Sequence, residues 1–150
     1  MIALDTNILV YALENNPDDA RNAAALELID RAGMVGAIIP FPVIGELFNA
    51  CRKKQIADVA QLTPRVELWM TAMSGAPAIL DDYLSAADLS QLYNVQYFDA
   101  LIITVAARAG ASILLSEDMH DGLEIDGLRI VNPFVAANDA LLADYFANTN

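Results

Sequence analysis

The sequence has 150 residues, a length typical of one domain with its own hydrophobic core. Hydrophobic residues make up 56% of the chain, and 20 acidic against 8 basic residues give a formal net charge of −12. Nucleic-acid-binding proteins usually present a basic surface, because their phosphate contacts come from Lys and Arg, so the overall charge argues against that class. Three explanations of the charge stay open: solubility of an apolar chain, a basic protein partner, or an acidic site neutralised by cations.

Membrane insertion and secretion are not expected. No apolar run reaches the roughly 18 residues that a membrane helix needs. The first residues lack the basic start and apolar centre of a signal peptide. Cys51 is the only cysteine, which rules out an internal disulfide, and we expect it to be a small core residue. A cytoplasmic location is therefore expected.

Strands and helices are expected to alternate in the first half of the chain. The apolar residues 2–4 predict a strand that ends at Asp5, and residues 8–13 predict a short helix. A second helix is expected over residues 18–32, where apolar side chains recur at helical spacing and Gly33 follows the end. Residues 37–40 predict the second strand, and residues 42–54 a helix that carries Glu46 beside its apolar face.

The middle of the chain predicts two more helices and a third strand. Thr63 and Pro64 are typical of an N-cap followed by proline in the first turn, which predicts a helix to Met73 with Trp69 in the core. Residues 78–80 predict the third strand. Ser85 with Asp88 resembles a capping box and predicts a helix that ends near Tyr93.

The last third repeats the alternation. The most apolar helix is expected from residue 98 to Gly110 at the C′ position, followed by strands over residues 113–115 and 128–131. Asn138 is expected to cap a final amphipathic helix within residues 136–150, which we interpret as a packing helix, with a subunit contact as one use of its apolar face. We predict a single α/β domain over residues 1–150, with a mostly parallel central sheet flanked by helices.

One basic run interrupts the acidic chain, formed by Arg52, Lys53 and Lys54. It has two interpretations. The run completes a helix end, where cations complement the helix dipole, or it contacts nucleic acid.

Five acids stand where the predicted elements change rather than on helix flanks. They are Asp5 after the first strand, Glu46, Asp99 near a helix start, and Asp118 and Asp121 after a late strand. In a parallel sheet, strand exits and the starts of the following helices share one edge, so these side chains could converge there. Each acid alone also has a structural explanation: Asp5 as a turn residue, Asp99 as a cap, and Asp121 with Gly122 as a turn.

Converging carboxylates would need protons or a cation to remain together. Oxygen ligands suit Mg²⁺ or Mn²⁺, and one or two such ions can support phosphodiester cleavage. The joint placement of the acids therefore predicts a divalent metal site.

The order of these motifs resembles the PIN-domain ribonucleases. The resemblance rests on Asp5-Thr6-Asn7 after an apolar strand, on Glu46, on residues 98–102 (FDALI) and on residues 115–122 (LSEDMHDG). Residues 126–134 also resemble the end of bacterial VapC-like toxins. The resemblance covers about residues 1–135, nearly the whole chain.

The resemblance implies a Mg²⁺- or Mn²⁺-dependent endoribonuclease, the toxin of a type II toxin–antitoxin pair, and it implies a role for each matching residue. Asp5 and Asp99 match the principal metal ligands, and Glu46 and Asp118 match further acids that hold metal-bound water or a second ion. The supporting positions follow: Thr6 and Ser116 match hydroxyls that orient the carboxylates, Asn7 matches a polar neighbour of the first acid, and Asp121 matches a less uniform extra acid.

The same resemblance implies an RNA substrate, a cognate antitoxin with a basic segment, and a homodimer, which the apolar excess of the chain also favours. His120, the only histidine, is not expected to be essential, because the acids explain the site without it. An alternative function is a PIN-fold binding or regulatory module with negligible turnover. A phosphohydrolase that forms an aspartyl-phosphate is disfavoured, because Asn7 stands where such enzymes carry a second Asp.

Overall fold

The computed structural model describes residues 1–14 and 16–148. In these residues six strands form one sheet: β1 (Ile2–Leu4), β2 (Ile38–Pro40), β3 (Ser74–Ala76), β4 (Ile113–Leu115), β5 (Glu124–Ile125) and β6 (Leu128–Val131). The helices are α1 (Thr6–Leu13), α2 (Ala20–Met34), α3 (Phe41–Lys54), α4 (Val59–Ala72), α5 (Leu80–Tyr93), α6 (Tyr97–Arg108) and α7 (Asp139–Ala147), with a 3-10 turn over Ala136–Asn138. The predicted alternation of strands and helices is confirmed.

The sheet has the strand order β3-β2-β1-β4-β6-β5. Every neighbouring pair is parallel except β5 with β6, so the predicted mostly parallel α/β fold is confirmed. The two central strands, β1 and β4, pair in the register Leu4 with Leu115. This register brings the residues that follow them, Asp5 and Ser116, to the same edge of the sheet.

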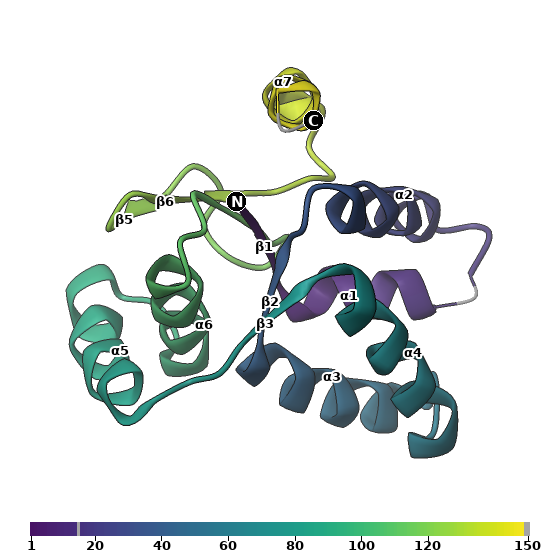
Figure 1. The fold of residues 1–150 in the computed structure, drawn as a ribbon, viewed down its shortest axis with the longest axis horizontal. Coiled ribbons are helices and arrows are strands. Elements are labelled where there is room, and N and C mark those ends of the chain that lie inside the picture. Colours follow the sequence, from purple (N-terminus) through teal and green to yellow (C-terminus); the bar gives the residue numbers. More distant parts are fainter. Residues whose placement is uncertain (15, 149–150) are drawn as a thin grey trace.

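Helices cover both faces of the strands. Figure 1 shows α5 and α6 side by side on one side of the strands, with α1 to α4 on the opposite side and α7 beyond α2. The strands β1, β2 and β4 are buried, and α6 places Leu101, Ile102 and Ile103 in the same core. Cys51 and Trp69 are buried as predicted. None of the described helices has both the length and the apolar character that crossing a bilayer requires.

The third strand was predicted in the wrong place. Residues 78–80 were expected to form it, but β3 is Ser74–Ala76, and α5 already begins at Leu80. Strand β3 contains Gly75 at a point where a Cβ would overlap the Phe41 ring. The strand therefore depends on pairing with β2 and on close packing against α3, which residue propensities do not reveal.

Two helix starts differ from prediction by four or more residues. Helix α4 begins at Val59, where Asp58 and Gln61 form a capping box, so Thr63 and Pro64 lie inside the helix and not at its start. Helix α5 begins five residues before Ser85. Its N-terminal acid is Asp82, whose Oδ2 accepts a hydrogen bond from the Ile79 amide at 2.8 Å. Asp82 satisfies a free backbone donor of the first turn, the role that was predicted for a later acid.

The chain end contains a hairpin that was not predicted. Strands β5 and β6 are antiparallel, and the residues between them, Asp126 and Gly127, have φ of 50° and 81°. An Asp-Gly pair with positive φ at both residues is typical of a tight hairpin turn. Asn138 stands at the predicted N-cap of α7, but its side chain makes no cap hydrogen bond and binds Asp121 instead. Of the predicted helix in residues 136–150, positions 149 and 150 lie outside the described residues.

Candidate active site

Asp5 is the buried centre of the site. It follows β1 directly and is the N-cap of α1, with its Oδ1 accepting a 2.6 Å hydrogen bond from the Thr6 amide. Its Oδ2 accepts hydrogen bonds from Ser116 Oγ at 2.6 Å and from Asn7 Nδ2 at 2.9 Å. The residue is only 5% exposed. Asp5 is therefore both a helix cap and a fixed acid at the sheet edge.

Asn7 connects the start of the chain to the loop after β4. Its Nδ2 lies 3.3 Å from Ser116 Oγ and 3.4 Å from Asp118 Oδ2, and its Oδ1 accepts a 3.3 Å bond from the Glu117 amide. Ser116 Oγ also accepts a hydrogen bond from the Met119 amide at 3.2 Å. These bonds hold the loop that carries Asp118 against the first turn of α1.

Glu46 and Asp99 reach the site from two helices. Thr6 Oγ1 donates a 2.8 Å hydrogen bond to Glu46 Oε2, which joins α1 to α3. Asp99 lies in the first turn of α6 but is not its cap, which is Gln96. No described residue donates a hydrogen bond to the Asp99 carboxylate. The structural explanation of Asp99 as a helix cap is therefore wrong.

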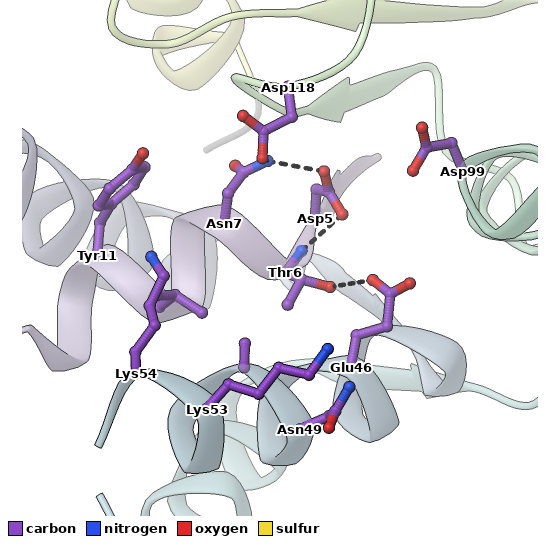
Figure 2. Close-up of a pocket in the computed structure, with 12 residues that line it drawn as sticks. Asp5, Thr6, Asn7, Tyr11, Glu46, Asn49, Lys53, Lys54, Asp99 and Asp118 are labelled. Atoms are coloured by element: carbon purple, nitrogen blue, oxygen red, sulfur yellow. Dashed lines mark hydrogen bonds between the residues drawn. The ribbon is translucent and has the colours of Figure 1, made fainter. Parts of the chain in front are cut away.

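All four of these acids line one pocket of about 390 Å³. Figure 2 shows the carboxyl groups of Asp5, Glu46, Asp99 and Asp118 around a common space, with Thr6 and Asn7 between them. Within residues 1–14 and 16–148, no Lys or Arg forms an ion pair with any of the four. The predicted convergence is thus observed for these acids.

The acids impede one another's ionisation. Burial raises the pKa of Asp5 to about 6, although the hydrogen bonds from Ser116 and Thr6 oppose this, and the nearby charges of Glu46 and Asp99 add to the rise. Burial also raises the pKa of Asp99, with further contributions from the charges of Glu46 and Asp118. A cation between the carboxylates would relieve this repulsion.

The side chains do not form a closed metal cage. Among the described residues, no three acidic, histidine or cysteine side chains lie close enough to surround one ion. The acidic donors facing the pocket are oxygens on four different segments of the chain, with open space between them. Such a set fits Mg²⁺ or Mn²⁺, of which Mg²⁺ in particular binds through one or two carboxylates and keeps several waters.

Asp121 and His120 lie outside the pocket. Asp121 Oδ1 accepts hydrogen bonds from the Asn132 amide at 2.8 Å and from Asn138 Nδ2 at 3.0 Å, so it ties the site loop to the segment before α7. The expectation that Asp121 converges with the other acids is wrong. Gly122 follows it with φ of 82°, in agreement with the alternative that the pair forms a turn. The His120 side chain is exposed and does not line the pocket.

A polar network of Tyr11, Arg21 and Glu117 beside the pocket was not predicted from the sequence. Tyr11 OH donates a short hydrogen bond to Glu117, and Arg21 Nη1 contacts both Tyr11 OH at 2.8 Å and Glu117 Oε1 at 3.0 Å. Arg21 also pairs with Asp19 at 2.7 Å. Burial and the bond to Glu117 raise the pKa of Tyr11, so its hydroxyl remains a donor. The sequence positions of these residues could have indicated the network, because Tyr11 follows Asn7 by one helical turn and Glu117 adjoins Asp118.

The opposite side of the pocket is basic and belongs to α3. Asn49, Lys53 and Lys54 line it together with Ala50. Figure 2 shows Asn49, Lys53 and Lys54 on the helix that carries Glu46, with the Lys54 side chain pointing toward Tyr11. Sequence reasoning recognised the basic run but did not connect it with Glu46, although Lys53 follows Glu46 by two helical turns.

The fold and the pocket define an α/β protein whose acids meet at the carboxyl edge of a parallel sheet. The family model of the PIN domain matches residues 2–124. The chain therefore belongs to the PIN-domain family. No curated protein sequence matches it.

Solved structures share the fold at low sequence identity. VapC20 of Mycobacterium tuberculosis, described as a sarcin-ricin loop cleaving toxin, has a TM-score of 0.63 and 19% identity over 79% of this chain and 90% of that chain. A toxin–antitoxin complex from Klebsiella pneumoniae has a TM-score of 0.63 and 19% identity over 89% and 98%. FitAcB from Neisseria gonorrhoeae has a TM-score of 0.59 and 16% identity over 89% and 99%.

Proposed function

We propose that this protein is a metal-dependent endoribonuclease and the toxin of a toxin–antitoxin pair. The observation that carries the proposal is a single pocket lined by Asp5, Glu46, Asp99 and Asp118, none of them neutralised by a described basic side chain. Membership of the PIN-domain family and the likeness to structures described as toxins and toxin–antitoxin complexes support it.

Asp5 and Asp99 would be the principal ligands of Mg²⁺ or Mn²⁺, with Glu46 and Asp118 as further acids around the ion. When bound, the ion would polarise the phosphodiester and activate a water for hydrolysis. The oxygen donor set and the mutual repulsion of the carboxylates support this assignment.

The remaining polar residues hold these acids in place. Ser116 and Asn7 donate to Asp5 Oδ2, which leaves Asp5 in one orientation. Thr6 donates its amide to Asp5 and its hydroxyl to Glu46, so a single residue positions acids from two elements. Asn7 fixes Asp118 relative to Asp5. Rigid positioning of this kind is what a reaction run by electrostatic stabilisation requires.

The test is RNA cleavage by Asp5→Asn and Asp99→Asn in Mg²⁺ or Mn²⁺. Because the carboxylates hold the ion that stabilises the transition state by several kcal/mol, each variant should lose at least about 100-fold in rate. Glu67→Gln removes an exposed carboxylate of α4 that does not line this pocket, and this variant should cleave normally. Unchanged cleavage by Asp5→Asn and Asp99→Asn would overturn the proposal.

The proposed partner is an antitoxin with a basic segment. An Arg guanidinium carries five donors in a planar fork that matches carboxylates in bidentate geometry. An antitoxin Arg could therefore occupy the space between the acids and displace the metal. Inhibition should weaken as salt is raised, because part of the attraction is electrostatic.

A homodimer acting on RNA in the cytoplasm completes the proposal. Large apolar side chains are exposed along α5 and at the start of α6, including Leu80, Leu84, Leu92 and Phe98. Exposed apolar surface of this kind favours burial between two copies. Light scattering after gel filtration measures the oligomeric state directly.

A catalytically weak binding or regulatory module is the second candidate. The net charge of −12 favours it, because RNA must approach an acidic molecule. Titration of Mn²⁺ into the pure protein by calorimetry separates the two. A nuclease should bind Mn²⁺ and cleave RNA, whereas a binding module should do neither. Loss of both Mn²⁺ binding and RNA cleavage in Asp99→Asn would show that the two properties depend on the same site.

A further inference from the structure

The pocket-facing side of α3 changes from acidic to basic along the helix. Glu46, Asn49 and Lys53 follow one another at spacings of three and four residues, so they occupy one face, and all three line the pocket. Figure 2 shows the side-chain nitrogens of Asn49 and Lys53 on the pocket side of this helix. Lys53 lies seven residues beyond Glu46, which is about 10 Å along the helix axis.

The chain has two lysines, and both line this pocket although the molecule is strongly acidic. Their contacts differ. Lys54 Nζ lies 3.2 Å from Glu14 Oε1 and 5.9 Å from the centre of the Tyr11 ring, so its charge is already engaged within the protein. Lys53 is exposed and forms no ion pair with any carboxylate in the described part of the chain. It remains available to an anion in the pocket.

Asn49 adds a neutral donor beside Lys53. Arg52 Nη2 donates to Asn49 Oδ1 at 3.2 Å, which occupies the amide oxygen and leaves Nδ2 as a donor. An ammonium and an amide N–H on adjacent turns can both donate to the oxygens of one phosphate. The positive charge of Lys53 repels a basic peptide, so this pair favours RNA over the proposed antitoxin.

We propose that Lys53, assisted by Asn49, binds a phosphate of the RNA strand next to the one that lies at the carboxylates. This inference rests on the proposed function and deepens it, because it names the residues that hold the substrate. The distance from Glu46 to Lys53 along α3 places this contact at a neighbouring phosphate and not at the scissile one. The RNA strand then runs along α3, with its phosphates over the basic end of the helix.

The Lys53 contact would also explain how an acidic protein can bind RNA. Repulsion from the body of the protein acts on the whole strand, whereas the Lys53 contact acts at short range on one phosphate. Lys is a compact charge on a flexible stem, which suits a phosphate whose neighbours on the strand differ between substrates. The contact therefore contributes affinity without base preference.

The test compares Lys53→Gln with the unsubstituted protein in steady-state cleavage of a single-stranded oligoribonucleotide. Loss of one exposed contact should raise KM up to about fivefold while kcat stays within about twofold. Above about 0.1 M salt, the slope of log kcat/KM against log salt should become shallower by about 0.7, the value for one phosphate on a single strand. Lys53→Arg should restore the slope, because it restores the charge.

Arg65→Gln is the matched control. It removes the same charge from an exposed position on α4 that does not line the pocket, and it should leave KM and the slope unchanged. Arg52 is unsuitable as a control because it contacts Asn49. Circular dichroism and thermal unfolding establish that each variant is folded.

Equal salt slopes for Lys53→Gln, Arg65→Gln and the unsubstituted protein would overturn the inference. If the unsubstituted protein does not cleave RNA at all, the proposed nuclease function fails. Fluorescence anisotropy of the same labelled oligonucleotide then measures Kd in place of kcat/KM. A shallower salt dependence of Kd in Lys53→Gln alone would support the contact even then, so the two failures are distinguishable.

Discussion

At Asp5, burial and hydrogen bonding act in opposite directions. Three donors, from Thr6, Asn7 and Ser116, favour the charged carboxylate, yet burial and the nearby acids raise its pKa from 3.8 to about 6. The carboxylate is therefore held in one orientation while its charge remains unfavourable without a cation. A site that binds a metal ion benefits from both properties, because it is ordered before the ion arrives and gains stability when it does.

Asp5→Asn should remove the unfavourable buried charge of Asp5 in the metal-free protein. The folded pKa lies above the unfolded value, so the stabilisation from the bound proton is complete below pH 3.8 and is lost as the pH rises through about 6. The free energy of unfolding of Asp5→Asn relative to the unsubstituted protein should therefore increase by about 1 to 1.5 kcal/mol between about pH 5 and pH 8. Urea unfolding in EDTA at several pH values measures this difference.

The change with pH is the diagnostic quantity in that experiment. The amide group that Asp5→Asn introduces would lose or reorient some of the hydrogen bonds from Ser116 and Asn7, which adds a constant offset to the difference. A difference that stays constant between pH 5 and pH 8 would contradict the raised pKa of Asp5.

His120→Gln should retain RNA cleavage within about threefold. The imidazole is exposed and lies outside the pocket, so it does not reach the reacting phosphate. The pH profile of kcat/KM is the second measurement, because loss of a general base would remove a limb of the profile. A fall of 100-fold or more, or a flattened profile, would make His120 a catalytic group after all.

Helices α5 and α6 are joined by an ion pair between Asp82, at the start of α5, and Arg108, at the end of α6. Asp82 is 2% exposed, caps the Ile79 amide, and accepts from Arg108 Nε at 2.7 Å and Nη2 at 2.9 Å. Arg108 Nη2 also donates to the Pro77 carbonyl at 2.6 Å. The bonds to Arg108 lower the pKa of Asp82. This pair fixes the start of α5 and the connection from β3.

Asp82→Ala should destabilise the protein by about 2 to 3 kcal/mol. It removes a helix-terminal hydrogen bond and the partner of Arg108, which remains partly hydrated and therefore costs less than a fully buried charge. Thermal unfolding measures the loss.

Asp88→Ala, the exposed acid that the sequence suggested as part of a capping box, is the control and should change stability by less than about 0.5 kcal/mol. A larger loss of stability for Asp88→Ala than for Asp82→Ala would contradict the observed start of α5.

These elements also show how far sequence reasoning reaches. The strands Ile2–Leu4, Ile113–Leu115 and Leu128–Val131 were predicted with the observed bounds, because each is a short and largely buried apolar run. Strand β3 was misplaced because Ser74 and Gly75 have low strand propensity and form a strand only through β2 and Phe41. Local patterns identify elements with buried faces and miss those that depend on a neighbour.

The candidate site was likewise predictable only where local patterns mark its residues. Asp5, Glu46, Asp99 and Asp118 could be predicted to meet, because parallel strands bring their exits to one edge and family motifs mark the positions. Asp121 was wrongly included, since its side-chain direction depends on Asn132 and Asn138, which lie further along the chain. Lys53 was recognisable only as part of a basic run until the helix face that carries Glu46 was known.

Charge is distributed unevenly over the molecule: the surface as a whole is acidic, whereas the pocket contains both lysines of the chain. The net charge of the chain is −12, yet its two lysines line the same pocket as the four acids. Repulsion of RNA by the body acts over the Debye length, about 30 Å at 0.01 M salt and about 10 Å at 0.1 M. Attraction at the proposed metal site and at Lys53 would act at contact distance, so repulsion and attraction should respond to salt in different ranges.

The rate of RNA cleavage should therefore pass through a maximum as salt is raised at constant metal concentration. From about 0.01 M to 0.1 M, screening of the acidic body should increase kcat/KM, because the strand approaches more readily. Above that range, competition by cations for phosphate should decrease it. Steady-state rates on one oligoribonucleotide across the range measure the curve, and Lys53→Gln should keep the rising limb while its falling limb becomes shallower. A rate that falls steadily from the lowest salt would show that attraction by the pocket dominates at every distance, against the charge distribution described above.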